Sequence, residues 1–380
     1  MALDLNSGEY KLLRDSFKKY IEVELKPNYQ QWEEDGVVPK EVWRKCGENG
    51  FLCPWVEEEY GGSGVDFGYS AIMIEELARH GTNMLFPLHS DIVVPYIHSF
   101  GTSEQKKKWL PGCVSGDLIA AVGMTEPNAG SDLAAITTTA TLEGDHYVIN
   151  GAKTFISGGH NCDLVILACK TNRQAVPAYR GISLIVVEDG TPGFIKGARL
   201  KKMGLKSQDT TELFFDNCRV PAANLLGKEN EGFIYLMQKL ERERLVCAIS
   251  AQGAAEKMLK DAMEYSAGRK IFGKPVSSFQ HNSFKLVEMA TEIELGRVFV
   301  ERLIEDHMNH ENVVKRVSMA KYWITEMANR VAYNCMQLYG GYGYMDEYPI
   351  SKDYRDIRIQ TIFAGTTEVM KHIIAKEIGL

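Results

Sequence analysis

The sequence lacks the features that mark several common classes of protein. Its eight cysteines form no C-x-x-C pair and lie beside no histidine cluster, so we expect neither disulfides nor a structural metal, and a reducing cytoplasm fits best. A formal net charge of −7 gives no overall basic field, which makes nucleic acid an unexpected partner. No apolar run approaches the roughly 20 residues of a membrane span. Residues 1–20 are amphipathic and carry acids, unlike a targeting peptide.

The spacing of apolar residues changes twice along the chain. From residue 8 to about 118 they recur every three or four positions, as in helices. Between about 119 and 228 short β-rich runs alternate with turn residues, and the Asn150-Gly151 pair predicts a hairpin there. Helical spacing then returns almost to Leu380. We therefore predict an α+β protein with an N-terminal helical domain (1–118), a middle β-barrel-like domain (119–228) and a C-terminal helical bundle (229–380).

Three glycine-containing segments bear on which ligands the chain binds. GGYGYM at 340–345 lies between predicted helices and is no G-x-G-x-x-G after a strand, so a Rossmann nicotinamide site is disfavoured. GMTEPNAGSDL at 123–133 enters a turn after which Ser131 and Asp132 offer helix-capping side chains. In TIFAGTTEVM at 361–370, Gly365 lets the backbone approach a ligand closely. That last turn carries no acid or base.

Six segments, taken together and in this order, closely resemble the acyl-CoA dehydrogenase family. They are MTEPNAGSD, INGAKTFISGG, LKSQDTTELFFDNCRVP, YSAGRKIFGKPVSSFQ, LYGGYGYMDEYPISKDYRD and IFAGTTEVMKHIIA, and they extend over most of the chain. The resemblance implies a flavoprotein, usually a homotetramer, with FAD between the β domain and the bundle and an acyl-CoA thioester against the flavin. It also implies oxidation of the thioester to an unsaturated product and transfer of electrons to an electron-transferring flavoprotein.

The resemblance assigns the ligand contacts by position. Around the flavin ring and its phosphates it places Met124, Thr125, Gly130, Ser131, Phe155 and Ser157. For the diphosphate and adenine of a neighbouring subunit's FAD it places Arg269, Phe272, Gln280, Gln337, Gly341, Thr366 and Glu368. An arginine suits this task because its planar fork matches phosphate oxygens. The residues expected to contact the substrate are Ser131, Arg244, Ala364 and Gly365, with the Ala364 N–H at the thioester carbonyl.

The position of the catalytic base departs from the commonest family pattern. Much of the family has a glutamate where this chain has Ala364, so a carboxylate must come from elsewhere. The first candidate is Glu243, which shares a helical stripe with the apolar or small residues Leu236, Leu240, Cys247 and Ser250. Burial there would raise its pKa toward neutrality. The isovaleryl and long-chain branches resemble this sequence in an "ERL" segment that supplies the base. The alternative is a solvated glutamate paired with Arg242 or Arg244.

Asp91 is the second candidate for the base. Its helical neighbours Pro87, Leu88, Val94 and Pro95 are apolar, and an aspartate in such a setting needs a partner or a function. A base here would lie over a different carbon, which suits an alicyclic or cyclic enoyl substrate such as a cyclohexene carboxyl thioester. The alternative is a helix N-cap or a hydrogen bond to nearby backbone.

Two other functions keep the same fold. An acyl-CoA oxidase would pass electrons to oxygen, and its rapid formation of peroxide in air would reveal it. A catalytically silent relative would keep the fold without a base, and Glu243 and Asp91 argue against it.

Overall fold

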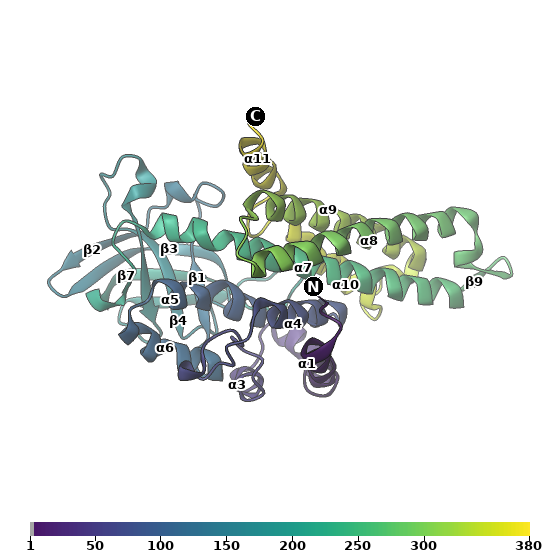
Figure 1. Cartoon of the computed structure of the whole chain (residues 1–380), viewed down its shortest axis with the longest axis horizontal. Helices are drawn as coiled ribbons and strands as arrows, with labels where there is room; N and C mark the ends of the chain where they lie inside the picture. The colour runs from purple at the N-terminus through teal and green to yellow at the C-terminus, as the bar shows by residue number, and fades with distance from the viewer. Residues whose placement is uncertain (1–3) are drawn as a thin grey trace.

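The computed structural model describes residues 4–380, in which helices, strands and helices follow one another in that order (Figure 1). This order confirms the predicted fold class. Residues 1–3, part of the segment that we expect to be no targeting peptide, lie outside the described residues. Within residues 4–380, no helix combines the length and the apolar character needed to cross a membrane.

The N-terminal part is a layer of short helices. Local sequence fixes several of their ends: Asp66 accepts the Gly68 N–H at the start of one helix, and Thr102 forms a capping box with Gln105 at the start of another. Two π-helical turns, η1 (Ile21–Leu25) and η3 (Leu88–Val93), interrupt the α-helical pattern. The helices are α1 (Gly8–Tyr20), α2 (Lys26–Asp35), α3 (Lys40–Glu48), α4 (Phe67–Arg79), α5 (Val94–Phe100) and α6 (Ser103–Ser115).

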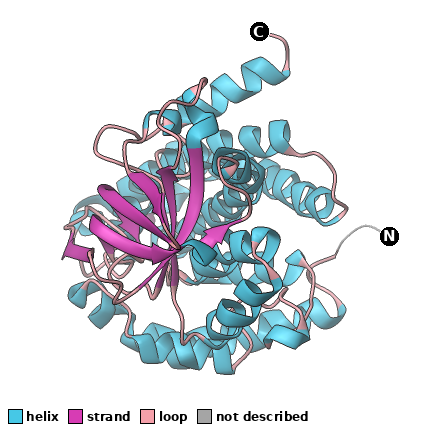
Figure 2. Ribbon diagram, turned by 90° about the vertical axis from the view of Figure 1, so that its left-hand side faces the viewer, coloured by secondary structure: helices cyan, strands magenta, loops and turns pink. Residues whose placement is uncertain are grey.

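The middle part is a sheet of eight strands. It faces the viewer in Figure 2, which looks at the molecule from the end that carries the sheet. The strands pair in the order β6-β7-β3-β2-β4-β5-β8, and β1 joins β4 as a parallel neighbour. Nearly every residue of β4 and β5 is buried, which explains their continuous apolar sequences. The strands are β1 (Ala120–Gly123), β2 (Thr139–Glu143), β3 (His146–Ser157), β4 (Leu164–Lys170), β5 (Ile182–Glu188), β6 (Phe194–Arg199), β7 (Thr210–Pro221) and β8 (Leu225–Leu226).

The hairpin predicted at Asn150-Gly151 is wrong. Strand β3 runs straight through this pair, and the turn that joins it to β2 lies earlier, at Gly144 and Asp145. The register of β3 against β7 shifts between Ile149 and Gly151, which is a β-bulge. A Cβ atom on Gly151 would lie 2.4 Å from the Thr138 Oγ1 atom, so glycine is needed there for close packing. Pairing with β7 therefore overrides the local turn preference of Asn-Gly.

The C-terminal part is a bundle built around one long helix. Helix α7 runs for 37 residues from the edge of the sheet to a small two-stranded hairpin of β9 (Lys270–Ile271) and β10 (Lys274–Pro275) (Figure 1). The GGYGYM segment forms a short 3₁₀ turn, η8 (Gly340–Tyr344), between two helices as expected. The helices are α7 (Gly232–Gly268), α8 (Gln280–Met308), α9 (Val314–Tyr339), α10 (Pro349–Ile357) and α11 (Thr367–Glu377).

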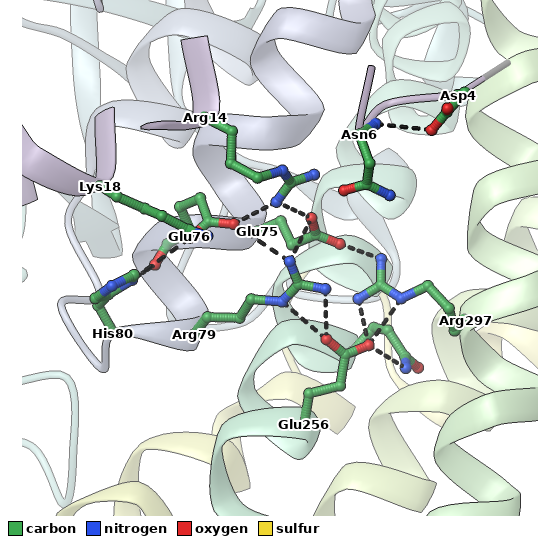
Figure 3. A network of polar contacts seen from close by, with 11 residues as sticks. Asp4, Asn6, Arg14, Lys18, Glu75, Glu76, Arg79, His80, Glu256 and Arg297 are labelled. Atoms are coloured by element: carbon green, nitrogen blue, oxygen red, sulfur yellow. Dashed lines mark hydrogen bonds and ion pairs between the residues drawn. The ribbon is translucent and has the colours of Figure 1, made fainter. Parts of the chain in front are cut away.

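A network of paired charges joins the N-terminal helices to the bundle (Figure 3). Glu75 and Glu76 of α4 are buried, and Arg14 of α1 binds both of them. Arg79 of α4 then reaches Glu256 of α7 with an Nη2–Oε2 distance of 2.7 Å, and Arg297 of α8 donates to the same glutamate. Buried charges persist in proteins when they are paired in this way. The network therefore fixes α4 against the helix that carries Glu243.

Candidate active site

Glu243 is a buried carboxylate on α7. Only 4% of the residue is exposed, and the hydroxyl of Tyr96, from α5, donates to its Oε1 atom at 2.8 Å. No residue among 4–380 donates to the other oxygen, Oε2. Burial raises the pKa of Glu243 to about 7, although the Tyr96 hydrogen bond and the Arg244 charge oppose the rise. The alternative of a solvated, ion-paired glutamate is wrong, and this carboxylate is poised to exchange a proton near neutral pH.

Asp91 is also buried, but it has a cationic partner. Arg242 of α7 forms an ion pair with its Oδ1 atom. The guanidinium of Arg242 in turn lies over two aromatic rings, 4.9 Å from the centre of Trp55 and 4.8 Å from that of Phe67. The alternative of a helix N-cap or a backbone hydrogen bond is wrong, because η3 has no side-chain cap and no backbone N–H among residues 4–380 donates to the Asp91 carboxylate. Asp91 is a charge-paired contact between the N-terminal helices and α7, and its charge is already compensated.

The turn before α11 presents free backbone donors. Ala364 and Gly365 have positive φ angles of 52° and 98°, a conformation that is strained for alanine. Among residues 4–380, the N–H groups of Ala364, Gly365 and Thr366 have no hydrogen-bond acceptor. The Thr366 hydroxyl caps α11 by accepting the Val369 N–H at 3.3 Å. Successive free N–H groups in a tight turn form a ready site for a carbonyl oxygen or an anion.

Arg244 follows Glu243 and is a buried cation with an unusual environment. It is only 6% exposed, yet it makes no hydrogen bond or ion pair with any residue among 4–380. Most buried arginines in proteins are paired, because an unpaired charge is costly to desolvate. The contact with the substrate that the sequence analysis expects of Arg244 stays a prediction.

Four of the residues expected at the flavin ring lie at one edge of the sheet. Met124 and Thr125 directly follow β1, and Phe155 and Ser157 are at the end of β3. The Thr154 N–H donates to the Thr125 carbonyl at 2.9 Å, which ties the two segments together. Phe155 is 68% exposed and has a φ of 57°, so an aromatic ring is displayed in a strained conformation. Met124 and Ser157 are half-buried on the same two segments. A planar, apolar ligand would find an aromatic surface and a hydroxyl here.

A buried ion pair supports the loop beneath these residues. Lys153 donates to the Met124 carbonyl at 3.1 Å and lies 2.8 Å from Glu126. Burial alone would raise the pKa of Glu126, but Lys153 and the hydrogen bonds from residues 137 and 138 hold it at about 2. Gly130 and Ser131 are exposed on the same loop. The capping role expected of Asp132 is wrong, because only a three-residue turn follows and Asp132 makes no cap hydrogen bond.

The remaining cofactor candidates lie mostly at the opposite end of α7, beside β9 and β10 (Figure 1). A cavity of about 760 Å³ there is lined by Arg269, Gln337 and Gly341, and the Arg269 guanidinium lies 5.5 Å from the centre of the Tyr342 ring. Phe272 is 93% exposed at the tip of the hairpin, and Gln280 is exposed at the start of α8. Thr366 and Glu368 are separate from this cavity, at the start of α11. The residues expected at the flavin ring and the cavity that contains Arg269 thus lie far apart within one chain, near the sheet and at the far end of α7.

Comparison with known proteins decides the family. Three family models match nearly the whole chain: "Acyl-CoA dehydrogenase, N-terminal domain" at residues 7–117, "middle domain" at 121–218 and "C-terminal domain" at 230–379. The chain belongs to the acyl-CoA dehydrogenase family. The predicted family, the oxidoreductase activity on CH–CH groups and the FAD cofactor are thereby confirmed.

Individual relatives agree with this family membership. The long-chain specific acyl-CoA dehydrogenase of Mus musculus is 47% identical over 98% of this chain and 87% of its own length. The crystal structure of an acyl-CoA dehydrogenase from Geobacillus kaustophilus has a TM-score of 0.98 and 57% identity, over 98% of this chain and 99% of that one. Butyryl-CoA dehydrogenase from Megasphaera elsdenii has a TM-score of 0.92 and 35% identity, over 99% and 100% of the two chains.

The residues present fit FAD. The exposed ring of Phe155, the free N–H groups before α11 and the arginine-lined cavity beside η8 offer, respectively, an aromatic contact, hydrogen-bond donors and a cation for a diphosphate. When bound to an acyl-CoA dehydrogenase, FAD accepts the hydride that leaves the substrate. The protein must then supply a base and donors for the thioester carbonyl.

Sequence reasoning missed two residues of this site. Tyr96 lies 147 positions from Glu243, and nothing in the segment VVPYIHSF shows which helix its hydroxyl meets. Lys321 of α9, whose ammonium donates to the Gly365 carbonyl, did carry a signal. Its neighbours at three and four residues, namely Val317, Ser318, Ile324 and Thr325, are apolar or small, the same pattern that singled out Glu243.

Proposed function

We propose that this acyl-CoA dehydrogenase uses Glu243 as its catalytic base on a saturated, long-chain acyl-CoA. The observation that carries the proposal is the buried Glu243 carboxylate, whose pKa is raised to about 7 in a chain that has Ala364 at the usual position of the base. The identity to the mouse protein, which is named for long-chain acyl-CoA, supports the substrate class.

In this mechanism the chain's own residues divide the work between proton and carbonyl. Glu243 takes the proton from the α carbon through Oε2, while Tyr96 holds Oε1. The N–H of Ala364 donates to the thioester carbonyl oxygen, on which negative charge grows as the proton leaves. General-base catalysis of this kind contributes about 10²–10⁴-fold in rate.

We further propose that the working form is a homotetramer in a reducing cytoplasm and that an electron-transferring flavoprotein accepts the electrons. An apolar stripe supports assembly: the exposed side chains of Phe284, Val287, Leu295 and Val298 recur at helical spacing on α8. The separation of the cofactor candidates supports it too, because a second copy could bring an Arg269 cavity to the Phe155 end.

The alicyclic alternative with Asp91 as base is not favoured. Arg242 already holds the Asp91 carboxylate, whereas Glu243 has a free oxygen. A catalytically silent protein is also disfavoured, because the chain keeps a buried carboxylate, Glu243, whose pKa is about 7.

An anaerobic screen of CoA thioesters tests the proposal. The flavin absorbance of the purified protein should bleach with straight-chain acyl-CoA, fastest with long chains, and the product should be the 2-enoyl thioester. Branched or cyclohexene carboxyl thioesters should react slowly. Absence of bleaching by every saturated thioester would contradict the proposal, and rapid peroxide formation in air would assign an oxidase instead.

A further inference from the structure

The turn at Ala364–Thr366 is held by side chains from a neighbouring helix. The Lys321 ammonium of α9 donates to the Gly365 carbonyl, and one helical turn further along, the Glu326 carboxylate accepts from the Thr367 hydroxyl at 2.7 Å. The first contact is made to Gly365, one of the two positive-φ residues, and the second lies two residues after it. Strain of this kind persists only where the surroundings enforce it, and it gathers at functional sites. Helix α9 is therefore the support that fixes the turn.

Lys321 is costly to keep in its position. The residue is fully buried, and the Gly365 carbonyl is its only hydrogen-bond acceptor among residues 4–380. Its ammonium forms no ion pair with residues 4–380, although the Glu326 and Glu368 carboxylates lie close enough to influence it. Burial accordingly lowers the pKa of Lys321. A lysine whose task was only to fill space could be replaced by an apolar residue at a gain in stability. Its presence at a fully buried position therefore points to a use for its charge or its donor.

The chemistry of the site gives that charge a use. Removal of the α proton places negative charge on the thioester oxygen, and donors that stabilise this charge must be held in place beforehand. The free N–H groups of Ala364 and Gly365 are such donors. By binding the Gly365 carbonyl, Lys321 restricts rotation of the peptide that follows these groups, and it brings a positive charge to the turn. Arg244, another buried and unpaired cation, lies close enough to influence Lys321.

We propose that Lys321 is a positioning residue for the thioester-binding turn: its ammonium fixes the Gly365 carbonyl so that the free amides of the turn meet the thioester oxygen, and its charge favours the anion that forms there. Lys321 touches no substrate atom, and it neither gains nor loses a proton. The identity of the ligand rests on the proposed function.

The test compares the wild-type holoenzyme with Lys321→Met, Lys321→Arg and Thr367→Val. Lys321→Met should lower the limiting rate of flavin reduction by up to about 10²-fold, the loss that follows removal of one direct oxyanion donor. Lys321→Arg keeps the charge and the donors and should recover part of that rate. Thr367→Val removes the second contact of the turn and should cause a smaller loss. Lys371→Met, an exposed lysine on α11, is the control and should behave as wild type.

A second readout needs no turnover. Binding of a trans-2-enoyl-CoA to the oxidised protein, measured by calorimetry, should weaken at least about 10-fold in Lys321→Met. Wild-type rate and wild-type binding in that variant would overturn the proposal. If Lys321→Met does not fold, Lys321→Arg and Thr367→Val decide: wild-type rates and binding in both would also overturn it.

A third readout separates this proposal from the proposed function. If no acyl-CoA reduces the wild-type flavin, the proposed function has failed. Amide hydrogen exchange in residues 361–370 then still tests whether Lys321 fixes the turn. Faster exchange in Lys321→Met and Thr367→Val than in wild type would support a fixed turn. Unchanged exchange in these variants would reject it.

Discussion

The hydroxyl of Tyr96 donates to Oε1 of Glu243 across the boundary between the N-terminal helices and the bundle, at a distance of 2.8 Å, and water reaches neither residue freely. The bond opposes the effect of burial, because it stabilises the charged carboxylate. The proton affinity of the base thus depends on how α5 packs on α7.

Replacement of Tyr96 by phenylalanine should therefore raise the pKa of the base. Flavin reduction by acyl-CoA should increase with pH through about 7 in the wild type, and the midpoint should lie higher in Tyr96→Phe because the charged form has lost a donor. The rate at pH 7 should fall several-fold while the rate at high pH is largely kept. Stopped-flow measurements from pH 6 to 9 check this. Tyr69→Phe, which removes a surface Tyr–Glu hydrogen bond, is the control and should leave the midpoint unchanged.

The two buried carboxylates should respond in opposite ways to amide substitution. Glu243→Gln keeps the shape and removes the basicity, so flavin reduction should fall by about 10²–10⁴-fold while thioester binding is nearly kept. Asp91→Asn leaves Arg242 without a charge partner, which should cost stability, roughly 3 kcal/mol, but little activity in the folded protein. Stopped-flow kinetics and urea unfolding of both variants separate the effects. An active Glu243→Gln beside an inactive Asp91→Asn would assign the base to Asp91.

Removal of Arg269 should release the cofactor. The guanidinium lines the cavity beside η8, and we expect it to pair with a diphosphate, so Arg269→Ala should be purified with much less FAD than wild type. The ratio of flavin to protein absorbance measures this, and light scattering measures the assembly. Arg219→Ala, an exposed arginine on β7, should keep the wild-type ratio. Full FAD content together with unchanged assembly in Arg269→Ala would refute this placement.

His89 should make the protein sensitive to acid. Its Nδ1 atom accepts the Ala120 N–H at 3.0 Å, so the neutral ring must donate to the Cys113 carbonyl through Nε2, at 2.9 Å. Burial lowers the pKa of His89 to about 4. The folded state then binds fewer protons than the unfolded state, so this contribution to stability is complete above about pH 6.5 and is lost as the pH falls toward 4. The loss should reach about 2 kcal/mol at pH 5.

Urea unfolding at pH 7 and pH 5 measures this loss. In His89→Gln, which cannot be protonated in this range, the difference between the two pH values should shrink by a similar amount. An equal pH dependence in both proteins would show that other groups cause the acid sensitivity.

Site residues could be predicted from the sequence where the pattern within a single helix or strand was sufficient to identify them. Glu243 stood out because the helical period of α7 placed a carboxylate on an apolar face, and that reasoning required no knowledge of the partner. Its environment could not be predicted in the same way, because Tyr96 arrives from another helix. The Asn150-Gly151 turn failed for the corresponding reason: the local preference was real, but pairing of β3 with β7 outweighed it. Asp91 needed a partner, as expected, and only the fold could show that the partner was Arg242.

Helix α7 carries Glu243 near its beginning and ends at Gly268, directly before Arg269. The 25 residues from 243 to 268 span about 38 Å at the usual rise of an α-helix. Under the proposed assembly one helix therefore serves two active centres, its own through Glu243 and a neighbour's through Arg269. Defects at the two ends should consequently complement each other. When Glu243→Gln and Arg269→Ala chains are co-expressed, some mixed oligomers would pair an intact Glu243 from one chain with an intact Arg269 from another, and activity should rise well above that of either variant alone.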